Sequence, residues 1–314
     1  MHILVTGGAG FIGSHLCDRL IERGHSVVAA DNFHLGRREN LAHLADDARF
    51  DLVELDVSDR HGLNTLFKKH SFECVFHMAA NSDIARSHAD PSVDLDNTFL
   101  TTYSVLDTMR LNGCRKLVFA STSAIYGEAP GQIREDYGPL RPISHYGAGK
   151  LASEAFITSF SENYGIQSWI TRFPNVIGDR ATHGVIYDFV GKLVREPHRL
   201  QVLGDGSQAK PYLFVSDLVA AILLAWDKSN EKVNVFNVGP ATTTTVRFIA
   251  EAVARSFGTN PSVEFGEGSR GWIGDVPRFE YDTNKIEALG WCPSHTSDEA
   301  VLKTIDILVG AVRQ

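Results

Sequence analysis

Apolar runs rich in β-branched residues alternate with amphipathic segments over about the first 120 residues of this chain. The apolar runs predict strands, and they occupy residues 2–6, 26–31, 50–56, 73–79 and 116–122. Segments with apolar side chains at helical spacing separate them, at residues 11–23, 62–69 and 97–111. Strands separated by helices favour parallel crossover connections. The pattern therefore predicts an α/β fold with a doubly wound parallel sheet and helices on both of its faces.

The pattern changes after residue 173. A helical pattern at 146–164 leads into the apolar run 167–173, and beyond it single glycines and loops become more frequent. We therefore predict a first domain at residues 1–173, with a returning segment near 214–238, and a smaller C-terminal α/β domain at residues 174–314. Beyond residue 173, apolar positions predict a strand at 233–239 and helices near 186–195, 216–226, 246–257 and 298–312.

Composition and charge narrow the class of protein. The chain has 314 residues, of which 43% are hydrophobic and 22% charged, as in soluble globular proteins. Its 38 acidic and 30 basic residues give a net charge of −8, which argues against nucleic acid as a partner. The longest apolar run, residues 218–226, is far shorter than the roughly 18 residues that suggest a membrane span, so we expect no membrane partner.

The cysteines and the start of the sequence bear on the compartment. Cys17, Cys74, Cys114 and Cys292 are scattered, without the spacing of a zinc site or of a secreted disulfide framework. We therefore expect no metal. The sequence opens on an apolar run and glycines without a basic region, which does not fit a signal peptide. These features predict a location in the reducing cytosol, that is, a cytoplasmic protein.

A glycine-rich segment lies directly between the first predicted strand and the first predicted helix. In GGAGFIG, residues 7–13, the glycines let the backbone approach a pyrophosphate, which then sits on the unpaired N–H groups of the helix N-terminus. An ordinary tight turn is the alternative. Asp31 ends the second strand, where an acid accepts hydrogen bonds from the adenosine ribose and repels a 2′-phosphate. The sequence therefore favours NAD over NADP, and Arg37 and Arg38 keep NADP open.

The ends of the third and fourth strands border the same crevice. Asp56 and Val57 could hold the adenine edge, and Ala79 and Ala80 are small enough to admit a cofactor. A helix cap at Asp56 and ordinary packing of the alanines are the alternatives. These positions alone do not separate the two interpretations.

Tyr146 and Lys150 are four residues apart at the start of a predicted helix, so both side chains lie on one helix face. An ammonium group beside a phenol favours the phenolate, which moves the tyrosine toward use as a general base. A pair on a surface helix is the alternative. The segment STSAIYG, residues 121–127, places hydroxyl groups after the fifth strand, at the edge where doubly wound sheets bind ligands. This second feature favours a catalytic site.

Taken in this order and spacing, the motifs TGGAGFIG, Asp31, HMAA, STSAIYG and YGAGK resemble the extended short-chain dehydrogenase/reductase superfamily. Within it they resemble the nucleotide-sugar epimerase/dehydratase branch, of the UDP-glucose 4-epimerase type. The likeness extends over nearly the whole chain, because residues 172–178, 203–218 and 270–277 resemble the substrate-side motifs of that branch. The resemblance implies a Rossmann domain that binds NAD, followed by a domain that binds a small-molecule nucleotide sugar.

The resemblance implies a role for each matching residue. Tyr146 would be the catalytic base and acid, Lys150 would lower its pKa and bind the nicotinamide ribose, and Thr122 would bond the reacting sugar hydroxyl. Asn97 would help to anchor this catalytic layer. The cofactor-binding residues would be Gly7, Gly10, Phe11, Ile12, Gly13, Asp31, Asn32, Asp56, Val57, Ala79, Ala80, Asn97, Tyr146, Lys150 and Phe173.

The resemblance also implies residues that bind the substrate. Ser123 and Asn175 would contact the nucleotide sugar. Lys210 stands where the family usually carries an arginine, and Pro211 replaces the aspartate that follows it. Lysine keeps a point charge for a phosphate but loses the bidentate geometry of arginine. Arg270 is offset from the second phosphate-binding arginine of the family, and solvated surface charge is the alternative for Lys210 and Arg270.

The residues after Thr122 bear on the reaction. Dehydratases of the branch expel the 6-hydroxyl with an Asp-Glu pair at the positions of Ser123 and Ala124, neither of which exchanges a proton at neutral pH. The resemblance therefore implies an isomerase, an NAD-dependent 4-epimerase of a UDP-hexose of the UDP-glucose/UDP-galactose type, with a transient 4-keto intermediate. A nucleotide-sugar dehydratase, a UDP-glucuronate-type epimerase and a non-enzymatic NAD-binding scaffold are the alternatives.

The resemblance further implies a homodimer. The helices at 97–111 and 146–164 resemble the pair that the family packs into an intersubunit four-helix bundle. Hydrophobic positions would then divide between the sheet and the partner, at Leu100, Val105, Leu151, Phe156 and Phe160. Burial of all five in the core of a monomer is the alternative.

Overall fold

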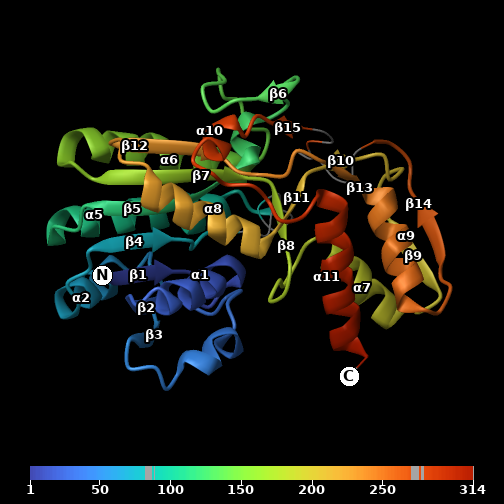
Figure 1. Cartoon of the computed structure of the whole chain (residues 1–314), viewed down its shortest axis with the longest axis horizontal. Helices are drawn as coiled ribbons and strands as arrows, with labels where there is room; N and C mark the ends of the chain where they lie inside the picture. The colour runs from blue at the N-terminus through green and yellow to red at the C-terminus, as the bar shows by residue number, and fades with distance from the viewer. Residues whose placement is uncertain (82–86, 88, 270–275, 277–278, 314) are drawn as a thin grey trace. The chain divides into compact units, whose positions relative to one another are not determined.

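The computed structural model describes residues 1–81, 87, 89–269, 276 and 279–313 (Figure 1). The contacts within it divide the chain into two compact units. Unit 1 comprises Met1–Ile125, Ser144–Arg172 and Val219–Phe236. Unit 2 comprises Tyr126–Ile143, Phe173–Leu218 and Asn237–Gln314. Each unit is therefore assembled from separate stretches of the chain.

A seven-stranded sheet forms the centre of unit 1, in the order β12-β7-β5-β4-β1-β2-β3. Its strands are β1 (His2–Thr6), β2 (Ser26–Asp31), β3 (Phe50–Glu54), β4 (Cys74–His77), β5 (Lys116–Thr122), β7 (Gln167–Phe173) and β12 (Val233–Asn237). All neighbouring pairs from β3 to β5 are parallel. The order of the strands along the chain reverses between β1 and β4, which is where doubly wound sheets bind ligands. The predicted doubly wound sheet is confirmed.

Helices cover both faces of this sheet, with α1 and α8 on one face and α2, α5 and α6 on the other (Figure 1). Their bounds are α1 (Phe11–Glu22), α2 (Arg60–Lys69), α5 (Thr101–Asn112), α6 (His145–Tyr164) and α8 (Val215–Lys228). The side chains of Asp59 and Ser144 cap α2 and α6 at their N-termini by accepting backbone N–H bonds. Gly113 and Gly165 follow α5 and α6 in the left-handed conformation that ends a helix. Local sequence therefore fixes where these helices begin and end.

The segment before α5 departs from the single helix expected at 97–111. A short helix, α4 (Ser92–Asp94), continues into a π-helix, η2 (Leu95–Leu100), and then into α5. A π-helix carries an extra residue in its turn and is frequent at functional sites. Two short 3₁₀ helices, η1 (Arg38–Leu44) and η3 (Ser123–Tyr126), complete the helical elements described in this part of the chain.

The core of unit 1 lies where the sheet meets α2, α5 and α6. Strand residues contribute to it from one face of the sheet, including Leu4, Val28, Val75, Leu117 and Phe119. Apolar residues of the helices pack against them, including Leu63, Phe67, Val105, Met109, Ile157 and Phe160. Strands that are buried on both faces read as continuous apolar runs, which is why the sequence revealed them so clearly.

Unit 2 combines helices with two-stranded sheets. Its helices are α7 (Val185–Arg195), α9 (Val246–Phe257), the short α10 (Asn284–Glu287) and α11 (Ser297–Val312). The strand pairs are β8 (Asn175–Ile177) with β11 (Tyr212–Phe214), β9 (Arg199–Val202) with β14 (Ser262–Phe265), β10 (Ala209–Lys210) with β13 (Thr244–Thr245), and β6 (Gln132–Ile133) with β15 (Glu280–Tyr281). Thr245 caps α9, and Thr296 with Glu299 forms a capping box on α11.

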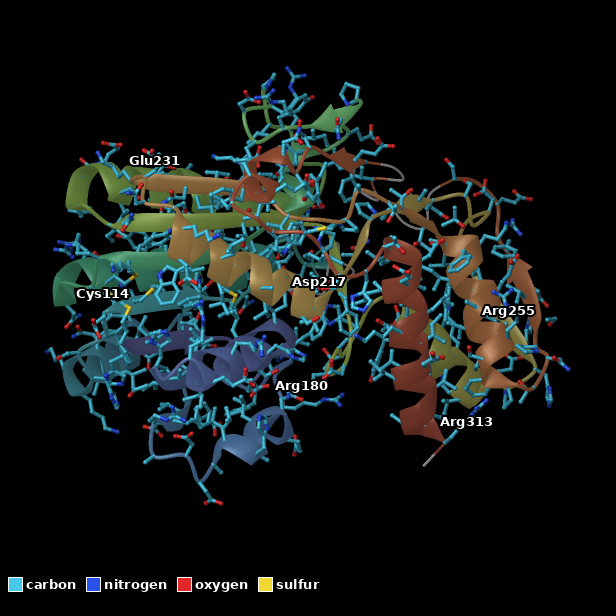
Figure 2. All side chains as sticks on the ribbon, viewed as in Figure 1. Cys114, Arg180, Asp217, Glu231, Arg255 and Arg313 are labelled. Carbon is cyan, nitrogen blue, oxygen red and sulfur yellow. The ribbon has the colours of Figure 1, made fainter. Side chains whose placement is uncertain are left out.

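Asp217, labelled in Figure 2 near the start of α8, anchors the segment that precedes α11. Its Oδ2 lies 3.1 Å from His295 Nδ1, and its backbone carbonyl accepts a hydrogen bond of 3.0 Å from Trp291 Nε1. The carboxylate is buried, with 5% of its side chain exposed. This contact holds two distant stretches of unit 2 together.

One stretch interrupts the first unit along the chain. Tyr126–Ile143 belongs to unit 2, although the residues on either side of it belong to unit 1, and the predicted domain boundary near residue 173 stays a prediction. Tyr126 Oη donates to Asn237 Oδ1 over 2.7 Å, and Ile133 pairs with Tyr281 in the β6–β15 sheet. These partners are far away in the sequence, so periodicity could not reveal them.

Candidate active site

The glycine-rich segment between β1 and α1 leaves no room for side chains. Gly7 has a φ of +64°, and a Cβ at this position would lie 2.8 Å from the backbone nitrogen of Ala79 on the neighbouring stretch after β4. A Cβ at Gly13 would lie 2.1 Å from the carbonyl oxygen of Gly7. Both distances are shorter than real Cβ contacts. The loop, the start of α1 and the end of β4 therefore approach one another as only glycine permits.

The N-terminus of α1 follows this loop. Gly10 is the N-cap and brings no capping side chain, and the first turn, which contains Phe11, Ile12 and Gly13, has no acidic residue. The first N–H groups of a helix lack intrahelical partners and lie at the positive end of the helix dipole. Such a terminus, reached by a glycine loop, fits the pyrophosphate of a dinucleotide.

Asp31 ends β2 beside the same loop and is 6% exposed. Its Oδ2 accepts a hydrogen bond of 3.0 Å from Ala9 N, and its Oδ1 accepts one of 2.8 Å from Phe33 N. Burial raises the pKa of Asp31, although the backbone hydrogen bonds act in the opposite direction. The carboxylate is thus fixed against the loop that fits the phosphates.

The charges around Asp31 also bear on the 2′-phosphate of NADP. Arg38 forms an ion pair with Glu54, and its guanidinium carbon lies 3.9 Å from the centre of the Phe33 ring. A 2′-phosphate near Arg38 would therefore meet the Glu54 carboxylate as well as Asp31. Repulsion from these two carboxylates disfavours NADP.

The other predicted cofactor residues lie at the ends of β2, β3 and β4. Asn32 Nδ2 donates to Asp56 Oδ2 over 2.9 Å. Burial opposes the charge on Asp56, but hydrogen bonds from Ser58 and Asn32 outweigh it and lower the pKa. Val57 is buried in the core, whereas Ala79 and Ala80 are partly exposed after β4. Their contacts with a cofactor stay predictions.

Thr122, Tyr146 and Lys150 meet at the carboxyl end of β5. Thr122 is the last residue of β5, and its side chain is hydrogen-bonded with that of Tyr146 in the first turn of α6. Lys150 lies one turn further along α6 and is 2% exposed. Its Nζ donates to Ala120 O over 2.7 Å and lies 5.9 Å from the centre of the Tyr146 ring. The structure therefore brings the three predicted catalytic residues together.

The electrostatics of this group bear on the expectation that Lys150 lowers the Tyr146 pKa. Burial raises the pKa of the Tyr146 phenol above its ordinary value; the hydrogen bond with Thr122 lowers it, and the charge of Asp94 raises it. Burial lowers the pKa of Lys150 to about 7, against the raising effects of Asp94 and Glu154. The net direction at Tyr146 is upward because loss of water outweighs the other influences, and a lowering effect of Lys150 on this pKa stays a prediction.

A chain of buried hydrogen bonds joins β1, β4, α5 and α6 next to this group. His77 lies between Thr6 Oγ1, 2.7 Å from its Nδ1, and Thr102 Oγ1, 3.1 Å from its Nε2. Ser153 Oγ of α6 donates to Thr102 Oγ1 over 3.1 Å. Burial lowers the pKa of His77 to about 3, so the imidazole is neutral at physiological pH. The sequence analysis missed Thr102 and Ser153, because isolated hydroxyl residues carry no pattern.

A buried ion pair fixes α6 to the sheet one turn beyond Lys150. Glu154 Oε2 lies 2.7 Å from Arg172 Nη2 of β7, and the two side chains are only 7% and 8% exposed. Ser121 Oγ of β5 donates to the same carboxylate. This pair was not predicted from the sequence. The available signal was the spacing, since Glu154 follows Lys150 by four residues and so lies on the same face of the helix.

The structure places Asn97 differently from its buried neighbour Thr98. Asn97 is exposed, and its Nδ2 donates to the carbonyl oxygen of Val93 over 3.0 Å. Thr98 is 1% exposed and lies against α6, where a Cβ added to Gly149 would be 3.2 Å from Thr98 Cγ2. The segment therefore faces α6 through Thr98, and a role for Asn97 in binding the cofactor stays a prediction.

The predicted substrate residues are divided between the units. Ser123 opens η3 and belongs to unit 1, whereas Asn175 and Lys210 belong to unit 2. Asn175 begins β8 and is exposed, and Lys210 ends β10 and is partly buried. Phe173, assigned to the cofactor, ends β7 and is counted with unit 2. Arg270 lies outside the described residues, and the roles of all five stay predictions.

Two further observations concern metals and membranes. Among the residues that the structure describes, no three His, Cys, Asp or Glu side chains are grouped so that they could hold a metal ion. Over the same ranges, no helix is both long enough and apolar enough to span a membrane.

Comparison with known proteins places this geometry in context. A family model described as the NAD dependent epimerase/dehydratase family matches residues 3–239. UDP-glucose 4-epimerase of Mycolicibacterium smegmatis is 33% identical over 98% of this chain and 98% of its own length.

Solved structures show the same similarity. UDP-glucose 4-epimerase of Thermus thermophilus, in complex with NAD, is 33% identical with a TM-score of 0.88, over 99% of this chain and 100% of that one. The dTDP-glucose 4,6-dehydratase of Streptomyces venezuelae, with NAD bound, is 27% identical with a TM-score of 0.89, over 100% of this chain and 98% of that one. Epimerases and dehydratases thus share this fold.

Proposed function

Since this chain belongs to the NAD dependent epimerase/dehydratase family, we propose that it is an NAD-dependent 4-epimerase of a nucleotide sugar, a UDP-hexose of the UDP-glucose/UDP-galactose type. The observation that carries the proposal is the bonded group of Thr122 and Tyr146 beside Lys150, with Ser123 and Ala124 in place of a second acid. The sequence similarity to UDP-glucose 4-epimerase of Mycolicibacterium smegmatis, which extends over nearly the whole length of both chains, supports the proposal.

NAD is the cofactor, and the residues of unit 1 fit it. The glycine cradle at Gly7 and Gly13 and the N-terminus of α1 would hold the pyrophosphate, and Asp31 would hold the adenosine ribose. When bound, NAD would supply reversible hydride transfer at the sugar carbon C4, and return of the hydride to the opposite face of the ring would give the C4 epimer without net consumption of cofactor.

The chain's own residues handle the proton of the C4 hydroxyl. Thr122 orients that hydroxyl, and Tyr146, which enters the step as the phenolate, takes its proton, becomes the neutral phenol and later gives the proton back. Because burial raises the pKa of Tyr146, the phenolate is a strong proton acceptor once it forms. Lys150, whose Nζ is held by Ala120 O, is a cation positioned to stabilise the phenolate. The sequence of steps needs no second acid.

The product is the sharpest test of epimerase against dehydratase. Expelling the 6-hydroxyl requires an acid within hydrogen-bond reach of that oxygen, and neither Ser123 nor Ala124 supplies one. We expect UDP-glucose or UDP-galactose to give a product of unchanged mass and different chromatographic mobility. Mass spectrometry after chromatography of a panel that includes UDP-N-acetylglucosamine and UDP-glucuronate checks this.

A Tyr146→Phe variant in the same panel is the negative control, and a known nucleotide-sugar dehydratase is the positive control for loss of water. A product lighter by one water would contradict the epimerase and favour the dehydratase. Turnover of UDP-glucuronate alone would favour the uronate epimerase. Binding of NAD with no turnover of any nucleotide sugar would favour the non-enzymatic scaffold.

We also propose that the chain is a homodimer that uses an aromatic face formed by α6 and by η2 with its continuation α5. Phe156 is 40% exposed, with its ring centre 5.0 Å from that of Phe99 and 6.0 Å from that of Tyr103. Leu100 is 41% exposed, whereas Val105 and Phe160 are buried. An exposed group of large apolar side chains on two adjacent helices is typical of a protein interface.

Phe156→Asp is expected to weaken this dimer by at least about 2 kcal/mol, or roughly thirtyfold, because it places a charge at the centre of an apolar interface. Leu302→Asp is the matched control, since Leu302 is 42% exposed on α11 of unit 2. Light scattering at a series of concentrations measures both variants. A wild-type protein that stays monomeric at micromolar concentration contradicts the dimer.

The cytosol is the compartment that we propose, with neither nucleic acid nor membrane as a partner. All four cysteines are free: Cys17, Cys74 and Cys114 are buried, Cys292 is exposed, and Cys114 is labelled in Figure 2. Free thiols are typical of a reducing compartment. The net charge of −8 disfavours binding to polyanions.

A further inference from the structure

A buried carboxylate, Asp94, lies next to the catalytic group and has no place in the reaction as described. It is 1% exposed, and its Oδ1 accepts hydrogen bonds of 3.1 Å from both Asn81 Nδ2 and Thr98 Oγ1. Within the described part of the chain, its Oδ2 has no hydrogen-bond partner. Burying a carboxylate is costly unless its charge is balanced. The position of Asp94 therefore calls for a nearby cation.

The backbone of Asp94 packs directly on α6, between the turns that carry Tyr146 and Lys150. A Cβ added to Gly149 would lie 3.3 Å from the carbonyl oxygen of Asp94. A side chain at position 149 would make a tighter contact than most, so this neighbour would have to shift by a few tenths of an ångström. The π-helix η2, which starts immediately after Asp94, continues this contact through Thr98. The backbone of Asp94 is thus held against α6, and Asn81 and Thr98 hold its carboxylate through hydrogen bonds.

Two other ionisable groups that the structure describes in this layer are already balanced or neutral. Glu154 is paired with Arg172 at 2.7 Å, and His77 is neutral because burial lowers its pKa to about 3. Among the described residues, Lys150 Nζ has a hydrogen bond to the uncharged carbonyl of Ala120. The charge of Asp94 acts on Lys150 and on Tyr146 alike. Asp94 packs on α6 at Gly149, next to Lys150, and its charge favours the protonated lysine, while neither residue has another ion-pair partner among the described residues.

We propose that Asp94 is a positioning residue of the catalytic layer, the counter-ion that keeps the Lys150 ammonium charged beside Tyr146. The expected effect of Asp94 on turnover rests on the proposed epimerase function, whereas its expected effect on the charge of Lys150 does not. Asp94 acts through Lys150 and is not itself assigned a contact with substrate or cofactor.

The proposal fixes the sign of the pH effect. A negative charge at Asp94 favours the protonated forms of both Lys150 and Tyr146, so its removal lowers both pKa values. Glu154, the other carboxylate that acts on Lys150, is unchanged and still paired with Arg172. Both limbs of the pH profile of kcat/KM should then move to lower pH.

The direct test is lysine side-chain ¹⁵N NMR on the purified protein, with the Lys150 signal assigned by its loss in Lys150→Met. Asp94→Asn keeps the shape of the side chain and the oxygen that accepts from Asn81 and Thr98, but it removes the charge. We expect the charged fraction of Lys150, at a pH above its midpoint, to fall by at least about tenfold, the effect of losing one opposite charge at close range.

Two control variants separate charge from structure. Thr98→Val removes one hydrogen bond to the carboxylate but keeps its charge, and Asp96→Asn removes an exposed carboxylate two residues away. Both should leave the Lys150 titration within about twofold of wild type. In the epimerase assay, Asp94→Asn should lose more activity at about pH 8 than at about pH 6, since Lys150 loses its charge earlier.

An unchanged Lys150 titration in folded Asp94→Asn overturns the proposal, even if the protein is an epimerase. Equal shifts in Asp94→Asn and Thr98→Val also overturn it, because the hydrogen bonds and not the charge would then set the state of Lys150. A protein without epimerase activity but with the expected NMR shift leaves the counter-ion assignment standing and removes only the proposed reaction.

Discussion

Tyr146→Phe is expected to fold normally and to lose at least about three powers of ten in epimerase turnover. The substitution removes one oxygen, which is the atom that takes and returns the proton of the C4 hydroxyl. The aromatic ring stays, so its packing and the Lys150 bond to Ala120 O are kept. Turnover of UDP-galactose, measured by coupled assay, checks the loss, and thermal unfolding checks the fold.

Tyr103→Phe is the matched control for this experiment. Tyr103 lies on α5 in the same unit and contacts Phe156 and Phe160 through its ring, away from Thr122. Its hydroxyl should be dispensable, with turnover within about twofold of wild type. Near-normal turnover in Tyr146→Phe would remove Tyr146 from its role. A similar loss in both variants would point to damage of unit 1 instead of lost proton transfer.

The sheet of unit 1 could be predicted because its physical cause is local. The strands at 2–6, 26–31 and 116–122 are continuous apolar runs, since a parallel sheet is covered on both faces. The helices between them carry their own signals, such as the Ser144 cap and Gly165 at the two ends of α6. The encounter of Tyr146 with Thr122 then follows from the topology, which brings the start of α6 to the end of β5.

The remaining features depend on contacts that no local pattern encodes. The excursion of Tyr126–Ile143 into unit 2 rests on partners such as Asn237, 111 positions from Tyr126. The π-helix at Leu95–Leu100 breaks the 3.6-residue period on which helix prediction relies. The direction of the Tyr146 pKa depends on burial and on Asp94, and neither is visible before the chain is folded.

Gly7→Ala is expected to lower the NAD content of the purified protein by at least about tenfold, through two separate penalties. A φ of +64° costs an alanine about 1–2 kcal/mol, because its Cβ approaches the carbonyl oxygen. In addition, this Cβ would lie 2.8 Å from Ala79 N and 2.9 Å from Ala79 Cα, which are backbone atoms that cannot swing aside. The loop must then move from the place where it would cradle the pyrophosphate.

Gly24→Ala separates the two penalties. Gly24 has a φ of +82°, but a Cβ there meets nothing within 4 Å. It should therefore lose about 1–2 kcal/mol of stability and keep its NAD, since only the backbone strain applies. NAD released from each denatured variant and the unfolding temperature measure the two effects independently. Equal NAD contents in both variants would show that the close approach of Gly7 to Ala79 has no part in holding the cofactor. If only Gly7→Ala loses NAD, cofactor binding depends on the absence of a Cβ at position 7.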